Sequence, residues 1–194
     1  MYKTAILVLN WNKPDLTLDS VNSILKINSR KIDYQIIIIA NGSSDDSLAI
    51  FNKHYQTHPK VKIITTNSNL GFAGGNNVGI LQALEKGADF ILLLNNDTIV
   101  DTDFLTGLFD FLESKPSVAA VSPKIYFAKG FEFHKNRYKP QELGNVIWYM
   151  GGVIDWENMY STHRGVNEVD HKQYEEEVET DHISGCCTLI RREA

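Results

Sequence analysis

The run Leu92-Leu93-Leu94-Asn95-Asn96-Asp97-Thr98 passes directly from apolar residues to amides and a carboxylate. This pattern is typical of a buried strand that delivers polar side chains to the carboxyl edge of a sheet, where open α/β sheets bind ligands. A carboxylate there, together with amide oxygens, supplies the hard oxygen ligands that a divalent cation prefers. An Asx-rich turn after a strand has the same composition. The neighbouring motifs must therefore decide between a binding site and a turn.

Three further polar clusters follow apolar runs in the same way. They are Asn10-Trp11-Asn12, the loop from Asn41 to Asp45, and the segment from Asn69 to Asn77. One such cluster is a turn, but in a parallel sheet all four lie along one edge. The set therefore predicts a polar cleft at that edge.

The segment from Asn69 to Asn77 is rich in glycine and is expected to be a loop that precedes a helix. Glycines let a ligand approach the backbone closely, and a helix amino terminus favours anions. Its glycine spacing differs from G-x-G-x-x-G and it follows the third expected strand, which argues against a dinucleotide fold. The chain contains no Gly-Lys-Ser/Thr, which excludes a P-loop.

The elements that must position these clusters alternate along the first 125 residues. Strands are expected at 4–9, 34–40, 61–65, 90–94 and 118–125, with helices near 14–25 (Asn12 as cap), 43–51, 78–87 and 103–113. The four consecutive isoleucines from Ile36 to Ile39 are typical of a strand buried on both faces. We therefore expect an α/β fold with a mostly parallel sheet. Residues 127–140 and 155–180 are expected to be loops or a flexible insertion, followed by a last strand near 183–190.

Length, composition and net charge exclude several classes of protein. The 194 residues, with 43% hydrophobic residues, suit one globular domain. A net charge of −5 argues against a nucleic-acid binder. No apolar run reaches the roughly 18 residues of a membrane helix, and the run from Ala5 to Leu9 is too short for a signal peptide. We expect a cytoplasmic protein.

Cysteine and histidine give no sign of a further metal or redox site. Cys186 and Cys187 are adjacent and are expected to stay reduced. No histidine pair has the spacing of a zinc-binding helix, so zinc catalysis is not expected; the four histidines of the irregular half are His134, His163, His171 and His182.

A stretch of the irregular half is both basic and aromatic. Its cations and histidine are Lys129, His134, Lys135, Arg137 and Lys139. Such a stretch can face an acidic lipid or a lipid-linked acceptor, and it is also typical of a solvated loop. Peripheral contact at the inner face of the membrane is therefore an open prediction.

Five motifs, in this order and spacing, resemble the inverting GT-A glycosyltransferases of family 2. They are ILVLNWN, IIIIANGSSDDS, NLGFAGGNN, FILLLNNDT and SGCCTLIRR, and they are most similar to the rhamnosyltransferase-like branch that builds bacterial surface polysaccharides. The resemblance implies a single GT-A domain over 1–194, with a nucleotide-binding half (1–125) and an incomplete acceptor-side half (126–194). It also implies transfer of a sugar, with inversion, from a UDP- or dTDP-linked donor to a saccharide or lipid-linked acceptor.

The resemblance also assigns roles to residues. It implies that Asp97 binds a divalent cation (Mn or Mg), that Asn95 contacts the ribose or a water, and that Ser184 to Cys187 lie on the acceptor side. Cys186 and Cys187 fit a core strand of small, closely packed residues equally well. The donor-binding residues that it implies are Asn10, Asn12, Asn41, Ser43, Gly71, Asn77, Asn95, Asn96 and Asp97.

The chain departs from this family in two places. Ala40 stands where family members usually have an aspartate that contacts the base. The family's general base lies in an acidic motif beyond the Arg-Arg segment, so we expect it beyond Ala194, and Asp155, Asp170 and Asp181 do not match it. These departures leave open a module that binds a nucleotide-sugar or a glycan without turnover. A nucleotidyltransferase is a third reading, but it would carry a glycine-rich loop with a basic residue after the first strand.

Overall fold

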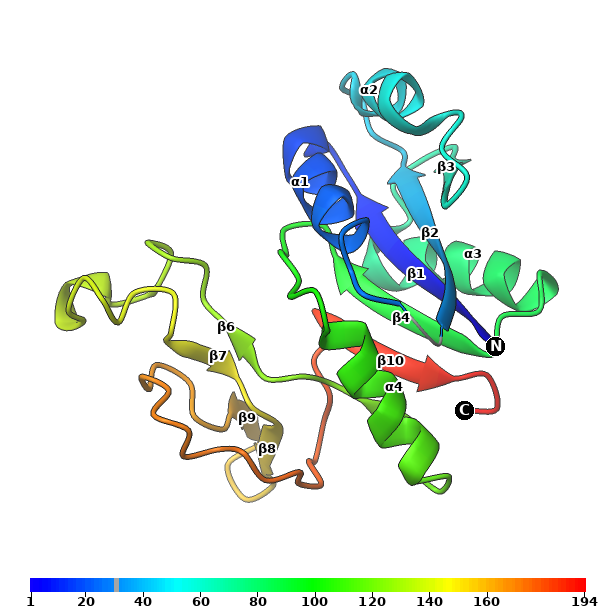
Figure 1. Ribbon diagram of the computed structural model, residues 1–194. Helices are drawn as coiled ribbons and strands as arrows, with labels where there is room; N and C mark the ends of the chain where they lie inside the picture. Colours follow the sequence, from blue (N-terminus) through cyan, green and yellow to red (C-terminus); the bar gives the residue numbers. More distant parts are fainter. Residues whose placement is uncertain (30–31) are drawn as a thin grey trace. The chain divides into compact units, whose positions relative to one another are not determined.

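Six strands form one sheet in the order β3-β2-β1-β4-β10-β5 (Figure 1). Their bounds are β1 Tyr2–Asn10, β2 Ile32–Asn41, β3 Val61–Thr66, β4 Phe90–Asn95, β5 Ala120–Val121 and β10 Cys187–Arg191. β1 to β4 are parallel to their neighbours, whereas β10 is antiparallel to β4 and β5. This computed structural model, which describes residues 1–29 and 32–194, confirms the α/β class and the mostly parallel sheet.

The apolar runs of the sequence form the centre of this sheet. Ile36, Ile38 and Ile39 of β2 are completely buried, as are Ile6 and Leu7 of the adjacent β1. Residues on both faces of these strands are buried because helices cover both faces, which is the arrangement that a continuous isoleucine run predicts.

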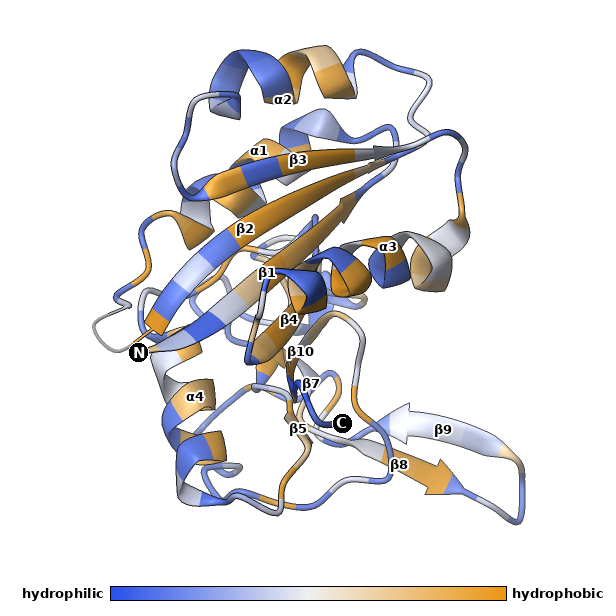
Figure 2. Ribbon diagram, turned by 90° about the vertical axis from the view of Figure 1, so that its right-hand side faces the viewer, coloured by the Kyte–Doolittle hydropathy of each residue, from blue (hydrophilic) through white to orange (hydrophobic). Residues whose placement is uncertain are grey.

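Four helices pack on the sheet: α1 Pro14–Ile24, α2 Ser47–Tyr55, α3 Gly71–Glu85 and α4 Phe104–Ser114. Figures 1 and 2 show α3 on one face of the sheet and α1 and α4 on the other. Beneath α3 the core contains Leu7, Ile39 and Ile91. On the opposite face the ring of Phe90 packs edge-on against Phe109 of α4, with centroids 5.5 Å apart.

The segment expected to be a glycine-rich loop is mostly helical, because α3 begins at Gly71. A Cβ atom on Gly75 would lie 2.5 Å from Leu9 Cδ1, and one on Gly79 would lie 2.7 Å from Ile39 Cδ1. These glycines therefore let α3 pack closely on β1 and β2, and the expectation that the loop exposes its backbone to a ligand is wrong for this part. Gly71 differs, because its φ of +72° lies in the left-handed region, which glycine adopts without strain.

Other expected bounds also change. Asn12 is not the cap of α1, because its φ is +52° and Lys13 occupies the cap position. The strand expected at 118–125 is divided into two short strands, β5 and β6 (Ile125–Tyr126). The last strand begins at Cys187 rather than at residue 183.

The chain forms two units, one of Met1–Val121 with Gly185–Ala194 and one of Ser122–Ser184. The second unit holds β6 and four other elements: the 3-10 helix η1 Lys135–Arg137, β7 Ile147–Tyr149, β8 Gly152–Asp155 and β9 Tyr160–His163. β6 pairs with β7 and β8 pairs with β9, each antiparallel. The functional division at residue 125 stays a prediction. Within 1–29 and 32–194, no helix is long and apolar enough to cross a membrane.

Candidate functional site

The ends of four parallel strands meet at one edge of the first unit's sheet. In the register of the sheet, Asn10 lies opposite Ala40, Leu9 lies opposite Asn95, and Asn41 lies opposite Thr66. The polar residues that follow β1, β2, β3 and β4 are therefore neighbours in space, as the sequence predicts. This edge is the candidate site.

Asn10 ties three segments of the edge together from a fully buried position. Its Nδ2 donates to the Ser43 hydroxyl at 3.0 Å, and its Oδ1 accepts from the Thr17 hydroxyl at 2.9 Å and from the Lys13 backbone N–H at 3.3 Å. The amide thus joins the end of β1 to the start of α1 and to the loop after β2. A buried amide with several partners fixes the positions of all of them.

Thr17 is a site residue that the sequence analysis missed. It is fully buried on α1, and its hydroxyl accepts a hydrogen bond of 3.0 Å from Asn96 Nδ2. A continuous chain of hydrogen bonds therefore runs from Asn96 through Thr17 and Asn10 to Ser43. The available signal was the helical spacing of Thr17 from the apolar Val21 and Ile24, because a polar residue on a buried helix face needs a partner.

Asn12 fastens the loop after β1 to the loop after β2. Its backbone N–H donates to the Ser43 hydroxyl at 3.1 Å, and its Oδ1 accepts from the Ser44 backbone N–H at 2.8 Å. Asparagine tolerates the left-handed backbone conformation of this position better than most residues. The two loops are therefore held together before any ligand binds.

Asn41 organises the connection from β3 to α3. Its side chain is buried; Oδ1 accepts from the Thr66 hydroxyl at 3.0 Å and the Leu70 N–H at 3.1 Å, while Nδ2 donates to Asn69 Oδ1 at 3.0 Å and Gly71 O at 3.2 Å. All four hydrogen-bonding positions of an amide are thereby used inside the protein. Asn41 shapes the edge with its whole side chain.

Asp97 contrasts with these buried amides. It is exposed after the end of β4, and no hydrogen bond or ion pair from the described residues occupies its carboxylate. The turn that presents it is closed by the Thr98 hydroxyl, which donates to the Asn95 carbonyl at 2.7 Å. Asn95 and Asn96 are half-buried beside it.

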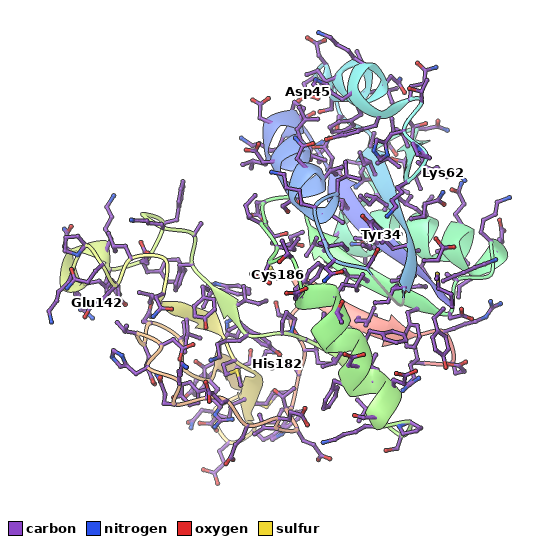
Figure 3. All side chains as sticks on the ribbon, viewed as in Figure 1. Tyr34, Asp45, Lys62, Glu142, His182 and Cys186 are labelled. Carbon is purple, nitrogen blue, oxygen red and sulfur yellow. The ribbon has the colours of Figure 1, made fainter. Side chains whose placement is uncertain are left out.

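The charge of Asp97 acts on the start of β10. The Asn95 N–H donates to the Cys186 carbonyl at 2.9 Å, which brings the Cys186 backbone against the end of β4 (Figure 3 labels Cys186). Burial and then the negative charge of Asp97 raise the pKa of the Cys186 thiol to about 11. The thiol is therefore protonated at neutral pH and is a poor nucleophile.

The first turns of α3 complete the edge. Asn76 is buried and its Nδ2 donates to the Phe72 carbonyl at 2.9 Å, whereas Asn77 is exposed. A Cβ on Gly185 would lie 3.1 Å from the half-exposed ring of Phe72, so the small residue leaves room for that ring. The acceptor-side role of Ser184 to Cys187 stays a prediction.

The donor set at this edge fits a cation that is shared with a substrate. Within the described residues, no three His, Cys, Asp or Glu side chains are grouped as a metal site. The exposed carboxylate of Asp97 with neighbouring amide oxygens is instead a partial set of hard ligands. Mg²⁺ and similar ions complete such a set with water and substrate phosphates.

Comparisons with known proteins identify the family. The model described as "Glycosyl transferase family 2" matches residues 5–194. The chain is 26% identical over 115 residues to a poly(ribitol-phosphate) beta-glucosyltransferase of Bacillus spizizenii, covering 59% of this chain and 18% of that protein. It is 28% identical over 123 residues to a poly-beta-1,6-N-acetyl-D-glucosamine synthase of Staphylococcus epidermidis, covering 62% and 28%. The chain thus spans less than a third of these relatives.

Solved structures show the same fold. Residues 1-349 of S. aureus TarS in complex with UDP-GlcNAc match with a TM-score of 0.57 and 22% identity, over 66% of this chain and 36% of that one. The mannosyltransferase PcManGT from Pyrobaculum calidifontis, in complex with GDP-Man and Mn2+, matches with a TM-score of 0.58 and 14% identity, over 98% and 44%. With its family match and this architecture, the chain belongs to glycosyl transferase family 2 and has the GT-A fold.

Proposed function

We propose that the carboxyl edge of the first unit binds the nucleoside diphosphate of a sugar donor and that the protein transfers the sugar with inversion. The observation that carries this proposal is the contrast at the edge between an exposed, unpaired Asp97 and a frame of internally bonded amides. Because the amides of this frame bond to other groups of the protein, the Asp97 carboxylate is the group that stays free to bind a ligand. Family membership and the nucleotide-sugars in the solved relatives support this choice.

Different residues have different proposed roles at the donor. Asn10 and Asn41 position the loops, because their amides are already used. Asn12 and Ser43 line the side where the base is expected, with Trp11, which is 54% exposed, as an additional aromatic surface for it. Gly71 and Asn77, which are exposed on α3, and the half-buried Asn95 and Asn96 at the end of β4 face the ribose and the diphosphate.

A divalent cation, Mn or Mg, is the proposed partner of Asp97. When bound, it neutralises the negative charge that develops on the leaving diphosphate and so acts as a Lewis acid. Asp97 would hold the cation through its carboxylate, and Asn95 would contact a water or the ribose. The amino terminus of α3 adds a favourable potential for phosphates through the helix dipole, although the N–H groups of Leu70 and Gly71 already donate to Asn41 and Asn69.

The proposed reaction is a displacement at the anomeric carbon. The oxygen of an acceptor hydroxyl forms the new bond as the bond to the diphosphate breaks, and the hydroxyl proton passes to a carboxylate base. A base in that position contributes roughly 100- to 10,000-fold. We assign this role to no residue of Met1–Ala194.

The acceptor and the donor sugar are finer parts of the proposal. The two curated relatives, which are named for a poly(ribitol-phosphate) and for a polymer of N-acetylglucosamine, support a saccharide or lipid-linked acceptor in the synthesis of a bacterial surface polysaccharide. The rhamnosyltransferase-like motifs favour a dTDP-linked deoxyhexose, whereas a UDP-linked sugar is the alternative.

One observation favours a second candidate, a module that binds a nucleotide-sugar or a glycan without turnover. Ala40, at the position where the family resemblance implies an aspartate, is 96% buried and offers the base no side-chain hydrogen bond. Recognition of the base would then rest on backbone groups and on the Asn12 side. A donor that binds but is never consumed with any acceptor would select this candidate.

Calorimetric titration with UDP and with dTDP, first with Mn²⁺ and then with a chelator, tests the proposal. We expect metal-dependent binding of at least one nucleotide. Asp97→Ala should weaken it by about 100-fold, the size of a lost interaction with a charged group of about 3 kcal/mol. Asp33→Ala, which removes an exposed carboxylate at the opposite end of β2, is the matched control and should bind normally. Unchanged affinity in Asp97→Ala would refute the role of Asp97.

A further inference from the structure

The second unit exposes two aromatic side chains and buries the carboxylate that separates them. Phe131 is 79% exposed and Phe133 is 68% exposed, while Glu132 is only 4% exposed. This reverses the usual distribution, because glutamate is rarely buried and large apolar side chains usually are. The segment from Lys129 to Lys139, which we name the aromatic–basic loop, is therefore built to present apolar rings outward.

Hydrogen bonds explain the inward position of Glu132. Its two carboxylate oxygens accept from the backbone N–H groups of Gly130 at 2.9 Å and Gly144 at 2.6 Å. Burial works to raise the pKa of Glu132, but backbone hydrogen bonds and the charge of Lys135 lower it below its usual value overall. The carboxylate is therefore ionised and used inside the loop. Because residues 131 and 133 flank an inward side chain, their rings point to the outside.

The cations of the loop share the outer surface with the two rings. Lys129, Lys135 and Arg137 are exposed, and among the described residues none of them forms an ion pair. Lys139 is also exposed, with Glu142, three residues further along the chain, at 3.9 Å (Figure 3 labels Glu142). The accessible charge of the loop is thus positive.

The loop is anchored to its own unit. The Tyr138 hydroxyl donates to the Asn167 carbonyl at 2.9 Å, and the edge of the Phe133 ring contacts the buried Phe127, with centroids 4.9 Å apart. Figure 1 shows the loop, coloured yellow-green, extending away from β6 and β7. A fixed, projecting loop presents its rings with little further ordering cost on binding.

We propose that the aromatic–basic loop docks the protein on an anionic lipid bilayer. Phe131 and Phe133 enter the boundary between headgroups and acyl chains, while the surrounding cations attract lipid phosphates. Aromatic and apolar side chains interspersed with Lys and Arg are the composition of interfacial membrane binding. Each cation near an anionic surface strengthens binding by about fivefold. A protein groove would satisfy the two rings but gives no reason for the exposed cations beside them, of which Lys129 and Arg137 have no acidic partner among the described residues. This inference does not depend on the donor site.

Co-sedimentation of the 194-residue chain with vesicles tests the docking. Two vesicle compositions are compared: phosphatidylcholine alone, and phosphatidylcholine mixed with phosphatidylglycerol. We expect binding to the mixed vesicles that weakens as salt is added, and much weaker binding to phosphatidylcholine alone. Lys135→Gln/Arg137→Gln should bind the mixed vesicles about 25-fold more weakly, because two cations are lost.

The aromatic contribution has a matched control in the same unit. Phe131→Ser/Phe133→Ser should weaken binding to the mixed vesicles by at least about tenfold, because apolar burial is lost. Trp156→Ser/Met159→Ser removes a pair of similar exposure, 70% and 78%, from the tip of the β8–β9 hairpin and should bind like the unmodified chain. Circular dichroism checks that both variants keep their fold, and Phe131→Ser alone, which leaves the contact between Phe133 and Phe127 in place, should already weaken binding.

Three outcomes would overturn the proposal. In the first, the unmodified chain stays in the supernatant when mixed vesicles are present. In the second, the hairpin variant loses as much binding as the loop variant. In the third, the chain binds neutral vesicles as well as mixed ones. Self-association without vesicles that disappears in Phe131→Ser/Phe133→Ser would assign the loop to a second copy of the chain instead. Nucleotide binding is measured separately, so a failure here leaves the donor site untouched.

Discussion

The two units organise their loops with different chemical groups. In the first unit the loops are held by neutral amides, above all Asn10 and Asn41, which donate and accept at the same time. In the second unit they are held by carboxylates: Glu132 accepts from backbone N–H groups, and Asp170 accepts from Lys124 at 2.7 Å and from Tyr126. An amide keeps its hydrogen bonds at any ordinary pH, whereas a carboxylate must stay ionised. Acid therefore leaves the amide bonds of the donor edge intact, whereas it breaks the carboxylate bonds that hold the loops of the second unit.

The largest expected effect is therefore a selective response of the second unit to acid. The pKa of Asp170 is lowered to about 2, first by hydrogen bonds from Lys124 and Tyr126, and the pKa of Glu132 is also lowered. A lowered pKa in the folded state adds stability that is present above the unfolded value, near 4, and is lost as pH falls toward the folded value. We expect the second unit to lose this stabilisation, and so to unfold more readily than the first, between about pH 4 and pH 2.

Amide NMR shifts measure this response residue by residue. Gly130 and Gly144 donate to Glu132, whereas Leu70 and Ser44 donate to amide oxygens of the first unit. The first pair of N–H signals should move to unfolded positions on acidification before the second pair. Simultaneous movement of all four would contradict the comparison.

Asn41→Ala should destabilise the first unit by about 3 kcal/mol, because the Thr66 hydroxyl and the Leu70 N–H lose their acceptor in a buried site. Urea denaturation measures the free energy of unfolding. Asn77→Ala removes an exposed amide from α3 and should change it by less than about 0.5 kcal/mol. Equal effects of the two substitutions would show that Asn41 is not an organising residue.

Glu132→Gln should destabilise the second unit by about 2 kcal/mol. The carboxylate of Glu132 accepts hydrogen bonds from two backbone N–H groups, and the NH2 group of glutamine cannot accept the bond from one of them. The reverse exchange, Asn41→Asp, sharpens the comparison. It removes the donors to Asn69 and Gly71 and should also destabilise the first unit. If either substitution left the free energy of unfolding in urea unchanged, the choice between an amide and a carboxylate would not matter at that position.

Asp97→Asn has the smallest expected effect, since an exposed and unpaired side chain carries little stability. The free energy of unfolding should stay within about 0.5 kcal/mol of the original. The pKa of Cys186 should fall, because one cause that raises it, the charge of Asp97, is removed while burial remains. The pH dependence of thiol alkylation measures this, and an unchanged profile would contradict the proximity of the two groups.

The sheet and its polar edge were predictable from the sequence because long apolar runs and the residues that end them are local signals. The start of α3 was not, since glycine and asparagine have low helix propensity. Gly75 and Gly79 are helical because they allow close packing on Leu9 and Ile39, a tertiary effect that no local pattern contains. The hydrogen bond between Thr17 and Asn96 was equally unpredictable from local patterns, because the two residues lie 79 positions apart in the sequence.

The second unit escaped prediction for a different reason. Its strands have between two and four residues, which is too short for a period of two to emerge. Its order depends on individual carboxylates such as Glu132 and Asp170. The basic and aromatic composition of the loop was visible in the sequence, but the inward turn of Glu132 that exposes Phe131 and Phe133 was not.

The position of β10 in the sheet has a consequence for biosynthesis. β10 lies between β4 and β5, so its pairing partners at Phe90–Asn95 are made long before Cys187–Arg191 leaves the ribosome. Until then, the outer side of β4 is an unpaired strand edge, which is a hazard for aggregation during synthesis. Ser122–Ser184 must be made before β10, and only two residues separate Ser184 from Cys187. The donor-binding sheet therefore stays open during the synthesis of the whole second unit and closes only once β10 has been made.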